Sequence, residues 1–139
     1  MYSNEQAKTR GQTFGNELKV IQDDLKNVTH SLDSKISMFK EGNIDRESFL
    51  EFTKKHEEEM GEIISRYNFL LTPKGFEKAV ELFKLSSKTQ LQSDIQIIEW
   101  VRTANNAAHI RSDTLLQESF EYEMAALAEY KRAQGMMNP

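Results

Sequence analysis

The first third of the chain carries apolar residues with a seven-residue period. Between them, further apolar residues follow at a spacing of three, and together they form a single seam: Leu18, Ile21, Leu25, Val28, Leu32 and Phe39. Spacings of three, four and seven residues place side chains on one face of an α-helix. The pattern therefore predicts an amphipathic helix of about 25 residues, ending near Glu41, that must bury this seam against other helices.

The chain has the size and composition of one domain. Its 139 residues are 38% apolar, which is sufficient for a hydrophobic core without cross-links. It contains no cysteine, so disulfides, thiol catalysis and cysteine-ligated metals are excluded. The net charge of −4, with scattered lysines, argues against nucleic-acid binding. We expect no membrane span or secretory signal, and hence a cytosolic protein.

A second helix is expected to follow a short turn. Gly42 is predicted to end the first helix in a left-handed conformation, and Asn43 to Asp45 to begin the next one. This second helix should run to about Leu71. Its expected inward face consists of Phe49, Phe52, His56, Met60, Ile63, Tyr67 and Leu70.

Thr72 and Pro73 are predicted to cap and open a third helix that ends near Ala104. Its middle, from Ser86 to Asp94, is polar, and a break into two helices there is an open alternative. Because no glycine or proline interrupts this stretch, we expect one continuous helix.

The last helix is expected to start at Ala107 or Ser112, after the asparagine pair 105–106, and to end at Ala133. Its predicted inward stripe consists of Leu116, Phe120, Glu123, Leu127 and Tyr130. The polar residues 1–15 are expected to form a mobile arm before Asn16 caps the first helix, and residues 135–139 a frayed tail. The predicted fold is an all-α, single-domain, antiparallel up-down four-helix bundle over residues 16–134.

Folding the chain at its predicted turns brings one polar layer together in the bundle. The helical phase points His56 inward and His30 outward, and His109 falls well away along the axis. The layer around His56 is expected to contain Ser87, Thr89, Gln90 and Glu123. It is interpreted as a hydrogen-bonded structural layer, and the alternative is a pocket for a small ligand or a metal ion.

The chain lacks the residues that define two families of helical enzymes. Ferritin-like di-iron bundles need a glutamate three residues before each ligand histidine, and this chain has Asn27, Thr53 and Asn106 at those positions. The run Glu58, Glu59 and Glu62 is similar to half of the magnesium motif of MazG-like pyrophosphohydrolases, but the second half is absent. No catalytic constellation, cofactor or metal site is therefore predicted.

His30 resembles the exposed mid-helix histidine of histidine phosphotransfer domains, which are also four-helix bundles. In that family a lysine and a glycine follow the histidine after three and four residues, whereas Asp33 and Ser34 stand there in this chain. Because Asp33 would repel a phosphate, this function ranks third.

The last helix carries small and apolar residues on a second face. Tyr122, Met124, Ala125 and Ala128 are candidates for contact with a partner, because a second apolar face implies a second packing surface. The alternative is that alanine simply favours helix. We expect a non-enzymatic protein-interaction or structural role, with a homodimer or another helical protein as the partner.

Overall fold

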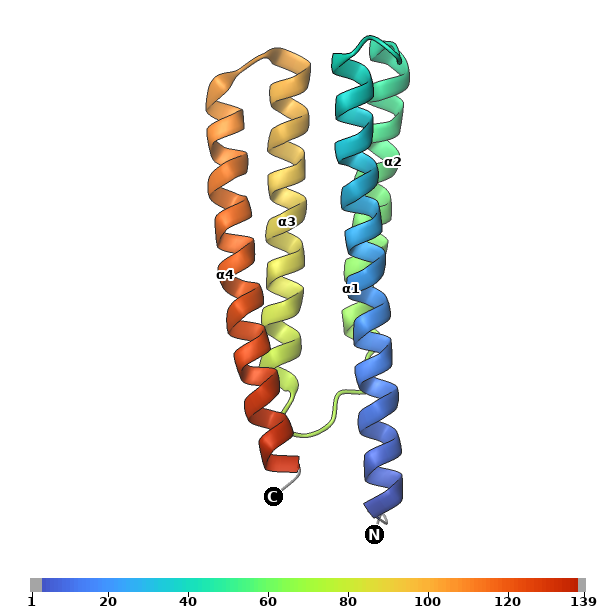
Figure 1. Ribbon diagram of the computed structural model, residues 1–139, viewed down its shortest axis with the longest axis vertical. Helices are drawn as coiled ribbons and strands as arrows, with labels where there is room; N and C mark the ends of the chain where they lie inside the picture. Colours follow the sequence, from blue (N-terminus) through green and yellow to red (C-terminus); the bar gives the residue numbers. More distant parts are fainter. Residues whose placement is uncertain (1–3, 138–139) are drawn as a thin grey trace.

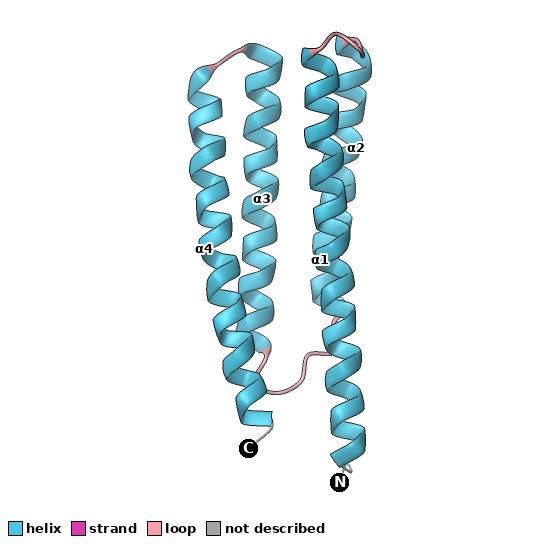
Figure 2. Ribbon diagram, viewed as in Figure 1, coloured by secondary structure: helices cyan, strands magenta, loops and turns pink. Residues whose placement is uncertain are grey.

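The computed structural model describes the backbone of residues 4–137 and the side chains of residues 12–136. Four α-helices follow one another along the chain: α1 (Asn4–Lys40), α2 (Arg46–Ser65), α3 (Glu77–Thr103) and α4 (Asn106–Met137). A short 3-10 helix, η1 (Arg66–Phe69), extends α2, and the described residues contain no strand (Figure 2). The prediction of an all-α chain with four helices is confirmed. None of these helices combines the length and apolarity that crossing a bilayer requires.

The helices form two hairpins. α1 packs against α2, and α3 packs closely against α4 along the length of the pair. The hairpins meet mainly through α2 and α3. Figure 1 shows the four helices side by side with both chain ends at the same end of the molecule.

The predicted apolar seam of α1 is buried and organises the core. Leu18, Ile21, Leu25 and Val28 join one cluster with residues of every other helix, and Leu32 joins a second cluster near the α1–α2 turn. In the second cluster, Phe39 stacks on Phe49 with ring centroids 4.8 Å apart.

Small residues with a seven-residue period line the contact between α3 and α4. They are Ala79, Ser86 and Ser93 on α3, and Ser112, Ser119, Ala126 and Ala133 on α4. The hydroxyl of Ser86 donates to the Ser119 carbonyl at 2.7 Å, and the Ser119 hydroxyl donates to the Ser86 carbonyl at 2.8 Å. Ser93 and Ser112 exchange the same two bonds at 2.8 and 3.0 Å. Hydroxyl-to-backbone bonds across the interface require a close, antiparallel approach of the two helices.

α1 begins earlier than the sequence predicts. Asn16 lies inside the helix and is not its cap, because α1 already starts at Asn4. Phe14 is only 2% exposed and contacts the rings of Phe76 and Tyr130, so burial of this side chain favours a helix that continues through Gly15. Residues 1–3 of the expected arm lie outside the described residues.

The α1–α2 turn follows the prediction, but the α2–α3 connection does not. Gly42 is left-handed with φ 78°, and the Asp45 side chain caps α2 by accepting from the Ser48 amide at 2.7 Å. α2 ends at Ser65 rather than near Leu71, and α3 starts at Glu77 rather than at Pro73. Gly75, with φ 97°, provides a turn before Phe76 enters the core.

α3 is one continuous helix, as predicted, and the left-handed residue that ends it is Ala104, with φ 61°, rather than an asparagine. The Asn105 side chain accepts from the Ala107 amide at 3.0 Å and so caps α4. The alternative start at Ser112 is wrong. At its other end, α4 continues through Gly135 to Met137, so the expected tail is helical as far as the description extends.

The predicted inward stripe of α4 is wrong for most of its length. Leu116, Phe120 and Leu127 are exposed, while the serines and alanines of the α3 contact are buried. Close approach of two helices requires small side chains between them, and this requirement turns the larger apolar residues outward. Only Tyr130 of the stripe packs against the core, on Phe14 and Phe76.

Candidate functional site

A buried histidine and aspartate link the two hairpins. His56 on α2 is 1% exposed, and its Nε2 lies 2.8 Å from Oδ2 of Asp94 on α3, which is also buried. The other carboxylate oxygen of Asp94 accepts from the Gln90 amide at 2.9 Å. Nδ1 of His56 has no hydrogen-bond partner among the described residues. The contact with Asp94 therefore gives one ring nitrogen of His56 a hydrogen-bond partner and leaves the other ring nitrogen buried without one.

Asp33 of α1 lies near this pair. Burial raises the pKa of Asp33 above its ordinary value, the negative charge of Asp94 raises it further, and the histidines His30 and His56 act in the opposite direction. Asp33 is therefore a second acidic group, beside Asp94, whose protonation is coupled to the charges of the buried pair.

The predicted layer around His56 is only partly assembled. Of its expected partners, Gln90 reaches His56 indirectly through Asp94. Ser87 instead bonds the Tyr67 hydroxyl at 3.0 Å, and Thr89 bonds the Leu85 carbonyl of its own helix. Glu123 lines a cavity together with Ser87 and Gln90, and His56 is not among the residues that line it. Asp94 was not among the predicted partners of His56, although it follows Gln90 by one helical turn on the same face.

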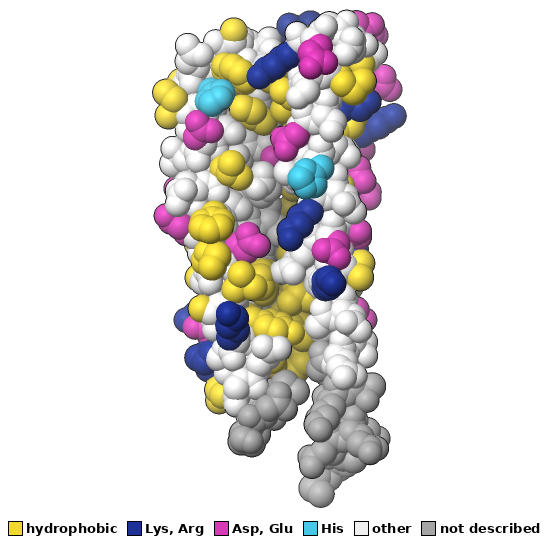
Figure 3. Space-filling view, in the orientation of Figure 1, with side chains coloured by type: hydrophobic (Ala, Val, Ile, Leu, Met, Phe, Trp, Pro, Cys, Tyr) yellow, Lys and Arg dark blue, Asp and Glu magenta, His cyan; other side chains and the backbone are white. Residues whose placement is uncertain are grey.

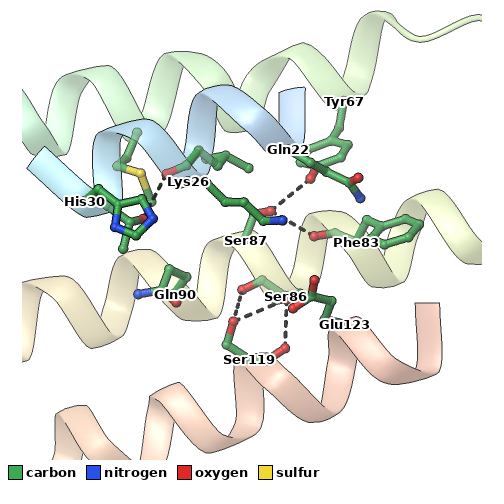
Figure 4. Close-up of a pocket in the computed structure, with 13 residues that line it drawn as sticks. Gln22, Lys26, His30, Tyr67, Phe83, Ser86, Ser87, Gln90, Ser119 and Glu123 are labelled. Atoms are coloured by element: carbon green, nitrogen blue, oxygen red, sulfur yellow. Dashed lines mark hydrogen bonds between the residues drawn. The ribbon is translucent and has the colours of Figure 1, made fainter. Parts of the chain in front are cut away.

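A cavity of about 170 Å³ lies between α1 and α4, over a floor formed by α2, η1 and α3. Its apolar floor contains Leu25, Met60, Tyr67 and Phe83. Its polar lining is contributed by three helices: Gln22, Lys26, Thr29 and His30 of α1, Ser86, Ser87 and Gln90 of α3, and Ser119 and Glu123 of α4. Figure 4 shows the labelled side chains of α1 on one side of the α3 serines and those of α4 on the other side.

The three histidines do not meet. His30 is exposed at the edge of the cavity, as its outward phase predicts, and His56 is buried below it. His109 packs edge-on against Trp100 at a centroid distance of 4.6 Å and approaches Asp113 within 3.3 Å. Among the described residues, no three His, Asp or Glu side chains are placed to hold a metal ion.

A stripe of side chains runs along the outward face of α4, and we call it the α4 stripe. It consists of Asp113, Leu116, Gln117, Phe120, Met124, Leu127 and Lys131, all of which are exposed. Phe120 is 55% exposed, and Leu116 and Met124 are each 48% exposed. Figure 3 shows hydrophobic side chains gathered on the surface over α4. Of the predicted interaction residues, Met124 lies in this stripe, Ala125 and Ala128 are exposed beside it, and Tyr122 is half-buried.

Comparison of the chain with protein-family models, with curated proteins and with solved structures finds no match.

Proposed function

We propose that this chain is a non-enzymatic helical module that forms a homodimer by packing the α4 stripe against the same stripe of a second copy. The single observation that supports this proposal is the exposure of Leu116, Phe120, Met124 and Leu127 along one face of a well-packed helix. Contiguous exposed apolar side chains on a small protein are typical of interaction surfaces. They are not needed for the core, because α4 packs on α3 through serine and alanine.

The charges at the ends of the stripe favour a second copy as the partner. Asp113 lies at one end and Lys131 at the other. When two such helices cross antiparallel at the level of Tyr122, Asp113 of each copy faces Lys131 of the other. The same register brings Phe120 opposite Met124, and Gln117 opposite Leu127. A two-fold interface requires this kind of self-complementary pattern, and a parallel arrangement would place like charges together.

The first test is the oligomeric state of Phe120→Glu. We expect the parent chain to be a dimer by light scattering during gel filtration, and the variant to be a monomer, because a charge in the centre of an apolar interface lacks a partner. Val20→Glu is the matched control, since Val20 is 50% exposed on α1 and lies away from the stripe. A parent chain that is monomeric at high concentration contradicts the proposal.

The second test exchanges the terminal charges. Asp113→Lys and Lys131→Asp should each weaken the dimer, because each change places like charges opposite one another. The double variant should restore it. If the double variant is as weak as the two single variants combined, the antiparallel register is wrong.

A further inference from the structure

The cavity between α1 and α4 presents charged and polar groups that the folded chain does not use. The hydroxyls of Ser86, Ser87 and Ser119 are occupied by bonds to one another, to backbone carbonyls or to Tyr67. By contrast, no hydrogen bond or ion pair within the described residues engages the side chains of Lys26 and Glu123. Both line the cavity, from opposite walls.

The two walls differ in chemical character. The α1 wall supplies cationic and donor groups from successive helical turns, namely Gln22, Lys26 and His30. The α4 wall supplies the carboxylate of Glu123, which points toward Ser86 and Ser119 in Figure 4. Between them lies the apolar floor of Leu25, Met60 and Phe83, which are nearly or fully buried.

α1 and α4 contact each other near the chain ends. A β-carbon placed on Gly15 would lie 3.2 Å from the Tyr130 hydroxyl, so the two helices touch there. Farther from the chain ends, the cavity lies between these two helices. The open space is smaller than the 300–1,000 Å³ that is typical of drug-sized ligands, so only a small ligand fits.

We propose that this cavity binds a small zwitterion with an apolar body, for which an aliphatic α-amino acid is the simplest example. The ligand's carboxylate would contact Lys26 and His30, its ammonium would contact Glu123, and its apolar part would cover the floor. A ligand with both charges leaves neither wall with an unpaired charge when water is displaced. This site lies beside the α4 stripe, because Gln90, Ser119 and Glu123 also line a shallow hollow next to residues of the stripe. Ligand binding does not require dimer formation.

The test uses leucine, isoamylamine and 4-methylpentanoate. The second compound is leucine with its carboxylate replaced by hydrogen, and the third is leucine with its ammonium replaced by hydrogen. Binding is followed by chemical-shift changes of backbone amides around the cavity. We expect leucine to bind in the millimolar range or tighter, and each single-charge analogue to bind about tenfold more weakly, because a charge-assisted bond is lost. No leucine-dependent change at cavity residues, or equal binding of all three compounds, overturns the proposal.

Two variants locate the charges. Glu123→Gln should lower the affinity for leucine to that of 4-methylpentanoate, and Lys26→Met should lower it to that of isoamylamine. Glu118→Gln and Lys19→Met are the matched controls, since both residues are exposed on the same two helices outside the cavity. If the control variants weaken leucine binding as much as the cavity variants do, the observed binding belongs to another site and the assignment is wrong.

Discussion

His56 is the residue for which the sequence pattern gave the clearest prediction, and its burial is confirmed. Its partner was not predictable from the helical phase alone, because the partner depends on the register between α2 and α3. The late start of α3 at Glu77 shifts this register by more than one turn, so Asp94 rather than Thr89 lies beside the ring. The connection over residues 66–76, which contains the 3-10 helix η1, has no simple periodicity to reveal it.

The His56–Asp94 pair should stabilise the fold only as a pair. Removing one member leaves a polar or charged group buried without its partner, so Asp94→Leu should lower the free energy of unfolding by about 3–5 kcal/mol. The double variant His56→Leu with Asp94→Leu should recover most of this loss, because both buried polar groups are then removed together. Urea unfolding of the parent, single and double variants measures the difference. Additive losses would show that the two side chains act independently.

Asp33 should make stability depend on pH. Burial and the charge of Asp94 raise the pKa of Asp33 above 3.8, so the folded chain holds this proton more tightly than the unfolded chain. Stability therefore falls as the pH rises from about 3.8 through the raised pKa. Asp33→Asn should be more stable than the parent at neutral pH, by less than about 1 kcal/mol because Asp33 is largely exposed.

The difference in free energy of unfolding between the parent and Asp33→Asn should disappear in acid, where Asp33 is protonated in both the folded and the unfolded chain. Urea unfolding at neutral and acidic pH measures it, with Asp23→Asn on the same helix as a control. If this difference in free energy of unfolding grows in acid, the pKa of Asp33 is not raised by folding.

Among the helices, α1 was predictable and α4 was not, for one physical reason. The seam of α1 consists of large apolar side chains, and large apolar residues with a regular period are buried in most helices. In α4, the period is carried by Ser112, Ser119 and Ala126, which ordinary hydrophobicity does not mark as core residues. The visible apolar pattern of Leu116 and Phe120 belongs to the exposed face.

The close α3–α4 contact should tolerate loss of a hydroxyl better than added volume. Ser86→Ala should lower the free energy of unfolding by about 1 kcal/mol, the usual net value of one hydrogen bond. Ser86→Leu should lower it by about 1–3 kcal/mol or more, because the larger side chain forces the helices apart. Thr114→Leu, on the exposed face of α4, is the control and should change stability little. Equal effects of Ser86→Leu and Thr114→Leu would show that the helices are not closely packed.

In the whole molecule, the number of helices and the α1–α2 turn followed from the sequence, but the α2–α3 connection and the unequal packing of the hairpins did not. α3 and α4 are joined by reciprocal serine bonds, whereas α1 reaches α4 through Phe14 and Gly15 near the chain ends. This inequality creates both candidate binding features, since it opens the cavity and leaves one face of α4 without a partner. Hydrophobic periodicity reports which face of each helix is apolar, but not how closely two helices approach.

Cysteine cross-linking measures the α4 pairing most directly, because the chain has no cysteine of its own. Asp113→Cys and Lys131→Cys are prepared separately, then mixed and oxidised. In the antiparallel register the two positions meet between copies, whereas each position lies about 27 Å from its own counterpart at 1.5 Å per residue. We expect a disulfide-linked dimer only in the mixture. Cross-linking of each variant alone, or none in the mixture, would contradict self-association through this face.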